Sequence, residues 1–409
     1  MLKTIDEKGN IIYGDLSLQK NLKLEFKGCN NIVFFAGSSL NANIVFQGNN
    51  ALFFHGGSGW MNGRVIIYFN GLCYVGKNAS FNGVDIRVYE GKNLIFGDDV
   101  MFSWGIWLSP SDHHLIFDGN THKRVNFGKS IYIGDHVWCS QEAAILKGSF
   151  VASGSILGAK SVNAGKKFSN AIYAGNPSKL IKENHFWSRE DPVDGSWTKE
   201  KILELSIMSK NDFIFNFEKD KFLDPSLIEA ELEKFETAAQ KLEFVYDYIY
   251  NNTHKNRFAL FKDSDASECK LYKDESKTPF SKLQFENLTK QENFISKPLG
   301  AVCLVKNHLS YKLGIAMIEN SKSFKRYLKM PFVLIKISKT HKKLAKNRVD
   351  LENFSDYEEA LRYKNYFSYK LGNALIQAHK NWYKGGYINF YFEVLKIKKD
   401  FKKTNPKLV

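Results

Sequence analysis

The amino-acid sequence predicts a β-solenoid followed by a mainly α-helical C-terminal region. Three observations support this: a six-residue repeat that is most regular over residues 133–163, helical spacing of apolar residues after residue 224, and a duplicated pentapeptide in the tail. A chain of 409 residues is long enough for roughly two to four domains. We expect a solenoid domain over residues 1–185, a linker and helical segment over 186–300, and a basic helical domain over 301–409.

The six-residue repeat predicts the solenoid. Its members are spaced six residues apart, and all but the last are apolar: Ile133, Cys139, Ile145, Val151, Leu157 and Asn163. This spacing is typical of a coil built from three short strands, each of which points one apolar side chain into a narrow prism. Upstream the spacing is looser, and pairs such as Asn49-Asn50 and Gly56-Gly57 fall where the chain would turn. An antiparallel sandwich is the alternative for this upstream part.

Helices are predicted for the rest of the chain. One helix should begin at Asp224-Pro225, because proline suits the first turn and apolar residues follow at helical spacing. In the tail, the pentapeptide SYKLG occurs at Ser310 and again at Ser368. Each copy is followed by an apolar stripe and then by an aromatic, lysine-rich stretch, so a duplicated helical hairpin is the simplest interpretation.

The positive charge is concentrated in the tail. Residues 301–409 carry 23 Lys and Arg against 8 Asp and Glu, which equals the net charge of +15 for the whole chain. Such a segment favours an anionic partner, either a polysaccharide or the inner membrane, where the protein would be peripheral; solvated helix faces are the alternative. Nucleic acid is not expected, because no known nucleic-acid module accompanies the charge. The charged start and the lack of a long apolar run predict a cytoplasmic protein.

Four segments carry the candidate chemistry: Ser111 to Ile116 (SDHHLI), Ile133 to Trp138 (IGDHVW), Gly158 to Val162 (GAKSV) and Ala174 to Lys179 (AGNPSK). In this order they resemble the hexapeptide-repeat acetyltransferases, particularly the branch with xenobiotic acetyltransferases and bacterial capsule or sialic-acid O-acetyltransferases. The resemblance implies a left-handed parallel β-helix, acetyl-CoA as cosubstrate, and a homotrimer that binds the cofactor between neighbouring prisms. Two departures, Cys139-Ser140 after Trp138 and no proline shortly before Ala174, fall at packing positions.

The resemblance also implies the site residues. His114 would be the general base, because imidazole titrates near neutral pH and can accept the proton of a sugar hydroxyl. Asp112 would orient it or bind the acceptor, since residues i and i+2 of a strand share a face. The remaining residues would line the acceptor or cofactor site (His113 and Trp138) or bind acetyl-CoA (Gly158, Ala159, Lys160, Asn176, Pro177 and Lys179). No metal is expected.

We therefore expect an O-acetyltransferase acting on a sugar hydroxyl of a bacterial surface glycan, with sialic acid as one candidate. The loop over residues 117–130 is polar and basic, which suits an anionic acceptor. Three alternatives remain: N-acetylation of a nucleotide-linked amino sugar, a carbonic anhydrase of the γ type in which three histidines hold a metal, and a non-catalytic glycan-binding scaffold.

Overall fold

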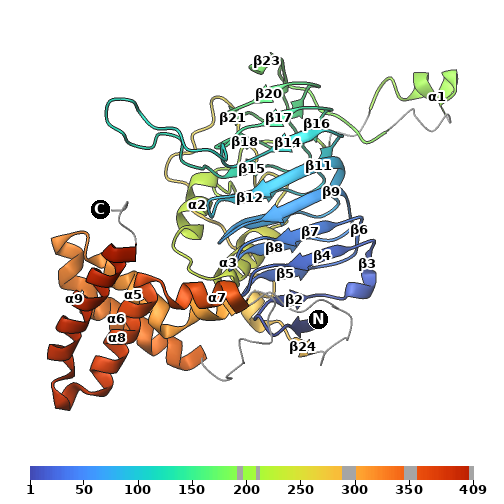
Figure 1. The fold of residues 1–409 in the computed structure, drawn as a ribbon. Helices are drawn as coiled ribbons and strands as arrows, with labels where there is room; N and C mark the ends of the chain where they lie inside the picture. The colour runs from blue at the N-terminus through green and yellow to red at the C-terminus, as the bar shows by residue number, and fades with distance from the viewer. Residues whose placement is uncertain (191–196, 209–211, 288–300, 345–356, 405–409) are drawn as a thin grey trace. The chain divides into compact units, whose positions relative to one another are not determined.

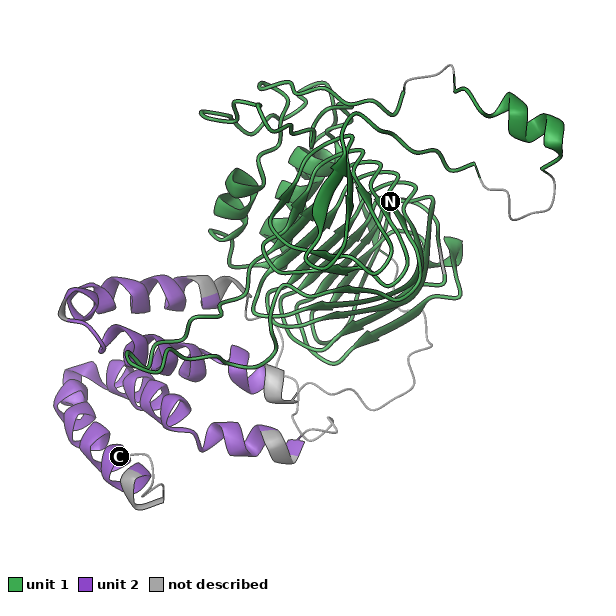
Figure 2. Ribbon diagram, turned by 90° about the horizontal axis from the view of Figure 1, so that it is seen from above, with its two compact units in different colours: residues 1–291 green, residues 292–409 purple. Residues whose placement is uncertain are grey.

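The computed structural model describes the chain except residues 191–196, 209–211, 288–300, 345–356 and 405–409 (Figure 1). It divides into two compact units, residues 1–291 and 292–409 (Figure 2). The first unit contains a β-solenoid of about seven turns over residues 11–163, followed by helices, so the predicted fold class is confirmed. The boundary at residue 291 places most of the segment 186–300 in the same unit as the solenoid.

Three ladders of parallel strands form the faces of the solenoid. The first face contains β2 (Ile11–Tyr13), β5 (Ile32–Phe35), β8 (Leu52–His55), β10 (Leu72–Val75), β12 (Asn93–Phe96), β15 (Ile131–Ile133), β18 (Phe150–Val151) and β21 (Lys166–Lys167). At its start, β1 (Leu2–Ile5) pairs with β2 and with β24 (Glu286–Asn287).

The second and third faces share two long strands, β9 (Gly59–Ile67) and β11 (Ser80–Val88), which bend from one face to the other. The second face also contains β3 (Gln19–Lys20), β6 (Ser39–Leu40), β13 (Met101–Phe102), β16 (Trp138–Cys139), β19 (Ile156–Leu157), β22 (Ile172–Ala174) and, antiparallel to β22, β23 (Lys179–Lys182). The third contains β4 (Lys23–Phe26), β7 (Asn43–Phe46), β14 (Ile106–Leu108), β17 (Ala144–Ile145) and β20 (Val162–Asn163).

The coils differ in length along the solenoid. Leu52 pairs with Ile32 and with Leu72, which are 20 residues away in either direction. Val151 pairs with Ile133, only 18 residues away. The early coils therefore hold two residues more than three six-residue units, which explains why the repeat is looser upstream.

Asparagines form the corners of the early coils. Asn30, Asn50 and Asn70 adopt left-handed backbone conformations, with φ of 55°, 59° and 55°. Asparagine tolerates this conformation better than most residues, because its short side chain can form local hydrogen bonds. The Asn50 side-chain amide donates to the Asn70 side-chain oxygen over 3.1 Å, so corners of successive coils are tied together.

The interior of the solenoid is mostly apolar, although the buried His55 lies in the inward row of an early coil, between Phe35 and Val75. The predicted inward residues from Ile133 to Leu157 are buried. Asn163 also points inward, where its amide donates to the Ser161 hydroxyl over 2.8 Å. Lys167 follows Val151 in the same row, and its ammonium donates to the carbonyl of Ala164 over 3.0 Å. Two polar side chains thus lie near the C-terminal end of the prism.

A segment after the solenoid covers the outer side of the first face. It contains α2 (Pro225–Leu232), α3 (Ala238–Phe244) and the π-helix η3 (Val245–Tyr250), whose apolar residues pack against outward aromatic rings of the strands. The Phe34 and Phe54 rings stack at 4.6 Å between centroids, and Tyr246 lies 5.6 Å from Phe34. The predicted helix start is confirmed, because Pro225 is the first helical residue and Asp224 caps the helix.

The second unit is built from helices: α4 (Ala301–Asn307), α5 (Leu309–Asn320), α6 (Phe324–Leu344), α7 (Tyr357–Lys364), α8 (Phe367–Lys380) and α9 (Gly386–Thr404). The two SYKLG segments lie in α5 and α8, which pack against each other. α6 packs on α5, and α9 packs on α8. None of the described helices is long and apolar enough to cross a membrane. Short elements complete the chain: η1 (Leu16–Leu18), α1 (Lys199–Glu204), η4 (Phe280–Lys282) and η6 (Trp382–Lys384).

Candidate functional site

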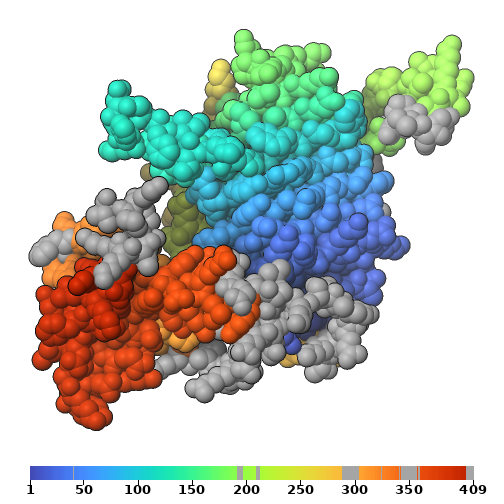
Figure 3. Space-filling view, in the orientation of Figure 1, coloured from blue at the N-terminus to red at the C-terminus, as the bar shows by residue number. Residues whose placement is uncertain are grey.

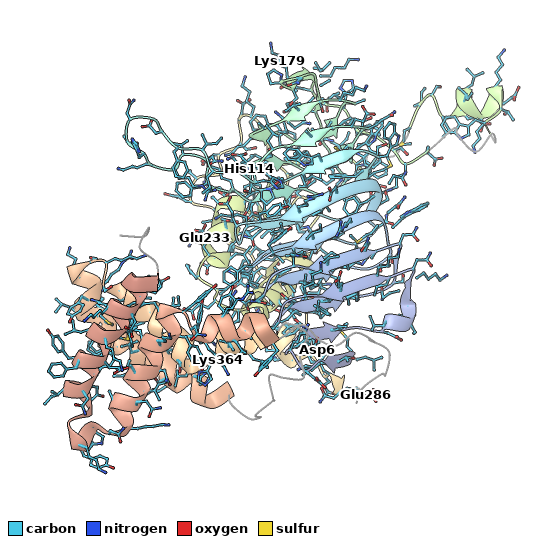
Figure 4. The ribbon with its side chains drawn as sticks, viewed as in Figure 1. Asp6, His114, Lys179, Glu233, Glu286 and Lys364 are labelled. Atoms are coloured by element: carbon cyan, nitrogen blue, oxygen red, sulfur yellow. The ribbon has the colours of Figure 1, made fainter. Side chains whose placement is uncertain are left out.

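A long loop leaves the solenoid between β14 and β15, over residues 109–130, and projects from it (Figure 3). His114 lies near the start of this loop (Figure 4). The expectation that Asp112 and His114 lie on one face of a strand is wrong, because strand conformation ends at Leu108 and His113 has a left-handed φ of 65°. The bend is closed by the backbone N–H of His114, which donates to the carbonyl of Asp112 over 2.7 Å.

The carboxylate of Asp112 is linked to His114 through a third residue, Asn126. Its carboxylate accepts hydrogen bonds from the ammonium of Lys147 and, over 3.0 Å, from the side-chain amide of Asn126. The same amide nitrogen donates to the carbonyl of His114 over 2.7 Å. The hydrogen bond from Lys147, supported by the one from Asn126, holds the pKa of Asp112 below its usual value. Asn126 therefore joins the carboxylate to the histidine backbone.

Glu90 fixes the two ends of the loop. Its carboxylate accepts hydrogen bonds from the Ser111 hydroxyl (2.5 Å), the Arg124 guanidinium (2.7 Å) and the Gly128 backbone N–H (3.2 Å). Partial burial raises the pKa of Glu90, but the hydrogen bonds from Arg124, Ser111 and Gly128 together outweigh it and lower that pKa to about 2. The loop is thus held by an ionised carboxylate.

The imidazole of His114 is available to a substrate. The side chain is exposed, and it makes no hydrogen bond to any residue that the structure describes. A general base needs this freedom, because one ring nitrogen must reach the proton that it removes.

His113 lines a cavity of about 490 Å³ beside the loop. Its Nε2 lies 3.2 Å from the Ser109 hydroxyl, and its ring packs edge-on against Tyr89, with 4.3 Å between the centroids. Tyr89 in turn stacks on Tyr68 at 4.3 Å. Arg124 also lines this cavity, whereas His114 does not. The two adjacent histidines therefore face different surroundings.

Trp138 lies half-buried on the second face, close to a later part of the chain. Its ring centroid is 6.0 Å from that of Trp187, which also stacks on the buried His136 at 4.0 Å. The imidazole of His136 is occupied on both sides, by Asp99 at 2.6 Å and by the carbonyl of Trp187 at 3.0 Å. His136 is thus engaged in packing and hydrogen bonding and has no nitrogen left for a metal.

The predicted cofactor residues lie on the last coils. Lys160 is exposed at a left-handed corner and forms an ion pair of 3.2 Å with Glu142. Lys179 is exposed and is the first residue of β23. It follows Pro177 by two residues, and the peptide bond between Asn176 and Pro177 is cis. Gly158 and Ala159 precede Lys160, at the end of β19. Among the described contacts, none joins these residues to the His114 loop.

Part of the chain is similar to two curated acetyltransferases. Over 121 residues it is 31% identical to a polysialic acid O-acetyltransferase of Escherichia coli O1:K1 / APEC, a match that covers 29% of this chain and 39% of that protein. A polysialic acid O-acetyltransferase of Neisseria meningitidis is 30% identical over 115 residues, covering 28% and 53%. Over these residues the chain is similar to polysialic acid O-acetyltransferases.

Two other comparisons concern a solved structure and a family model. The crystal structure of the polySia-specific acetyltransferase NeuO matches with a TM-score of 0.42 and 29% identity, covering 48% of this chain and 94% of that one. Residues 229–403 match a family described as a domain of unknown function (DUF8374). The chain spans only about two fifths to one half of the two curated acetyltransferases above.

Sequence reasoning missed two residues of the site. Glu90 lies on the preceding coil and Lys147 on the following one, so neither is near His114 in the chain. Only the coil geometry brings them to the loop. Asn126 belongs to the loop over residues 117–130, whose polar character the sequence does show. Its hydrogen bonds to Asp112 and His114 form only because the loop folds back on itself.

Proposed function

We propose that the protein is an acetyl-CoA-dependent O-acetyltransferase that acts on a sugar hydroxyl of a bacterial surface glycan, with sialic acid as the candidate acceptor. The observation that carries this proposal is the exposed imidazole of His114. It lies on a loop that internal hydrogen bonds hold in place, in a chain that is similar to an acetyltransferase. The matched region of each relative includes less than two thirds of its length, so the acceptor is inferred from their names together with the chemistry of the loop.

The proposed reaction is a direct transfer. The acceptor hydroxyl gives its proton to His114 as its oxygen attacks the thioester carbonyl of acetyl-CoA. The tetrahedral intermediate then collapses, the carbon–sulfur bond breaks, and the departing thiolate takes the proton back from the imidazolium. The acetyl group moves to the sugar oxygen and coenzyme A leaves as the thiol. No covalent enzyme intermediate is required.

The loop carries cations that suit an anionic sugar. Arg124 lines the cavity beside His113, and its guanidinium is shared with Glu90 and the carbonyl of Asn126. Lys123 and Lys129 are exposed on the same loop. A carboxylate on the acceptor would pair with such donors through charge-assisted hydrogen bonds.

We further propose that the chain works as a homotrimer in the cytoplasm and peripherally at the inner membrane. The loop presents apolar side chains that are each more than half exposed, as expected of a surface that packs against a neighbouring copy: Leu115, Ile116, Phe117, Val125 and Phe127. In such an assembly Trp138, Lys160 and Lys179 would meet the cofactor at the border between copies. Analytical ultracentrifugation of the purified chain measures whether it is a trimer.

The proposal is tested by offering acetyl-CoA with a panel of acceptors. We would measure thiol release and, by mass spectrometry, the acetylated product with oligosialic acid, neutral oligosaccharides and a nucleotide-linked amino sugar. Acetyl esters on the acidic glycan support the proposal. An amide product on the amino sugar would instead establish N-acetylation, and glycan binding without any thiol release would establish a non-catalytic scaffold.

A further inference from the structure

The duplication in the second unit extends beyond the pentapeptide. Residues 328–337 (LKMPFVLIKI) of α6 correspond to residues 388–397 (INFYFEVLKI) of α9 at a constant offset of 60. Each of these helices packs on the helix that precedes it, α6 on α5 and α9 on α8. The two copies can therefore be compared position by position.

Both copies expose the same four apolar positions. On α6 they are Tyr327, Leu328, Phe332 and Ile335, which are 54–75% exposed; on α9 they are Tyr387, Ile388, Phe392 and Leu395, which are 47–68% exposed. On a helix these positions fall within one stripe, which Tyr391 joins in α9. We call each set the outward stripe of its helix.

The outward stripes are not the sides by which these helices pack on their own unit. In α6, Val333, Leu334 and Ile337 are partly covered, and in α9 Ile397 is buried. Each helix is thus apolar on two sides, one of which is covered within the unit. An apolar stripe that both copies leave open indicates a surface for a partner.

Lysines lie within the outward stripes, and carboxylates lie away from them. Lys339 and Lys399 are exposed at corresponding positions, four residues after Ile335 and Leu395. α6 carries no Asp or Glu. In α9, Glu393 is two residues before Leu395 and Asp400 five after it, which places them roughly 160° and 140° around the helix from Leu395, and roughly 100° and 80° from Phe392 at the edge of the stripe.

We propose that the outward stripes of α6 and α9 dock on the surface of an anionic lipid membrane. The apolar and tyrosine side chains would enter the headgroup boundary, and the lysines would extend to the lipid phosphates. A second copy of the chain fits less well, because lysines are depleted from the centres of protein interfaces. In this arrangement α6 and α9 lie along the membrane surface. This docking does not depend on the proposed acetyl transfer.

The test is co-sedimentation of the full chain with vesicles of phosphatidylcholine, with and without phosphatidylglycerol. Wild-type protein should bind the anionic vesicles, and its binding should fall as salt is raised. Phe392→Ser with Leu395→Ser, combined with Phe332→Ser and Ile335→Ser, should weaken binding at least about tenfold, because four apolar side chains no longer leave water. Lys339→Glu with Lys399→Glu should also weaken it.

Asn389→Ser is the matched control, because Asn389 is exposed on α9 outside the outward stripe. Circular dichroism of every variant confirms that the helices remain folded. The proposal is overturned if wild-type protein ignores anionic vesicles, or if the stripe variants bind as well as the control. It is also overturned if the outward stripes drive self-association, measured by light scattering, while vesicle binding is absent.

Discussion

Gly372 of α8 lies directly against the backbone of Ser310 of α5. A Cβ atom placed on Gly372 would lie 1.8 Å from the Ser310 carbonyl oxygen. The relationship is reciprocal, because a Cβ on Gly314 would lie 1.7 Å from the carbonyl oxygen of Ser368. The Ser and Gly of each SYKLG copy are thus the contact residues for the other copy. The duplication supplies both halves of one close helix crossing.

Gly372→Ala should destabilise the second unit by at least about 2 kcal/mol, because a methyl group cannot fit against a backbone carbonyl without moving the helix. The midpoint of the helical circular dichroism signal on urea titration measures this loss. Ser368→Ala is the control, since it keeps a small side chain at the same crossing and should change the midpoint little. Equal midpoints for Gly372→Ala and wild type would show that α5 and α8 do not pack this closely.

Arg257 connects the segment that covers the first face (α2, α3 and η3) to the solenoid, because its guanidinium contacts both Ile249 and Asp135. Its guanidinium is fully buried and pairs with Asp135 at 2.7 Å and with Asp98 at 3.1 Å. Arg257→Ala leaves the buried Asp135 without its partner, so we expect a loss of about 3 to 5 kcal/mol in unfolding free energy. Chemical denaturation measures it, and the exposed Lys255→Ala is the matched control. A loss no larger than that of the control would contradict the buried ion pair.

The solenoid was predictable because its late coils keep one local period. Ile133, Cys139 and Ile145 point inward as the six-residue spacing requires. The packing of α2, α3 and η3 on the first face was not predictable from the sequence. These helices pack on a row of outward aromatic rings such as Phe34 and Phe54, which are 20 residues apart, and no local pattern in the helices matches that row. The contacts of the Asp112 carboxylate were not predictable for a related reason, because one of its partners, Lys147, comes from the next coil.

The stability that Glu90 provides should depend on pH in the acid range. Its pKa is lowered to about 2 in the folded protein, against about 4.3 in an unfolded chain. Its contribution is therefore complete above about pH 4.3 and is lost as the pH falls toward 2. We expect the difference in unfolding temperature between wild type and Glu90→Gln to be largest near neutral pH and to shrink with acidification. A difference that stays constant from neutral pH to pH 2 would exclude this role.

Asn126→Ala should lower the rate of acetyl transfer by about tenfold or more, because the amide joins the Asp112 carboxylate to the His114 carbonyl. Since Asn126 positions the base without touching the reacting atoms, kcat should fall while the pH profile keeps its shape. Asn120→Ala, on the exposed part of the same loop, is the matched control. A variant that loses activity only through a raised KM would place Asn126 in acceptor binding instead.

His114→Ala should lower kcat by at least about a hundredfold, the usual contribution of a general base. The structure offers a matched control in His122, which is exposed on the same loop and lies outside the hydrogen-bonded base. His113→Ala separates the two neighbours: because His113 lines the cavity, its loss should act mainly on the KM of the acceptor. If His113→Ala abolishes turnover while His114→Ala retains it, the base is the histidine that faces the cavity.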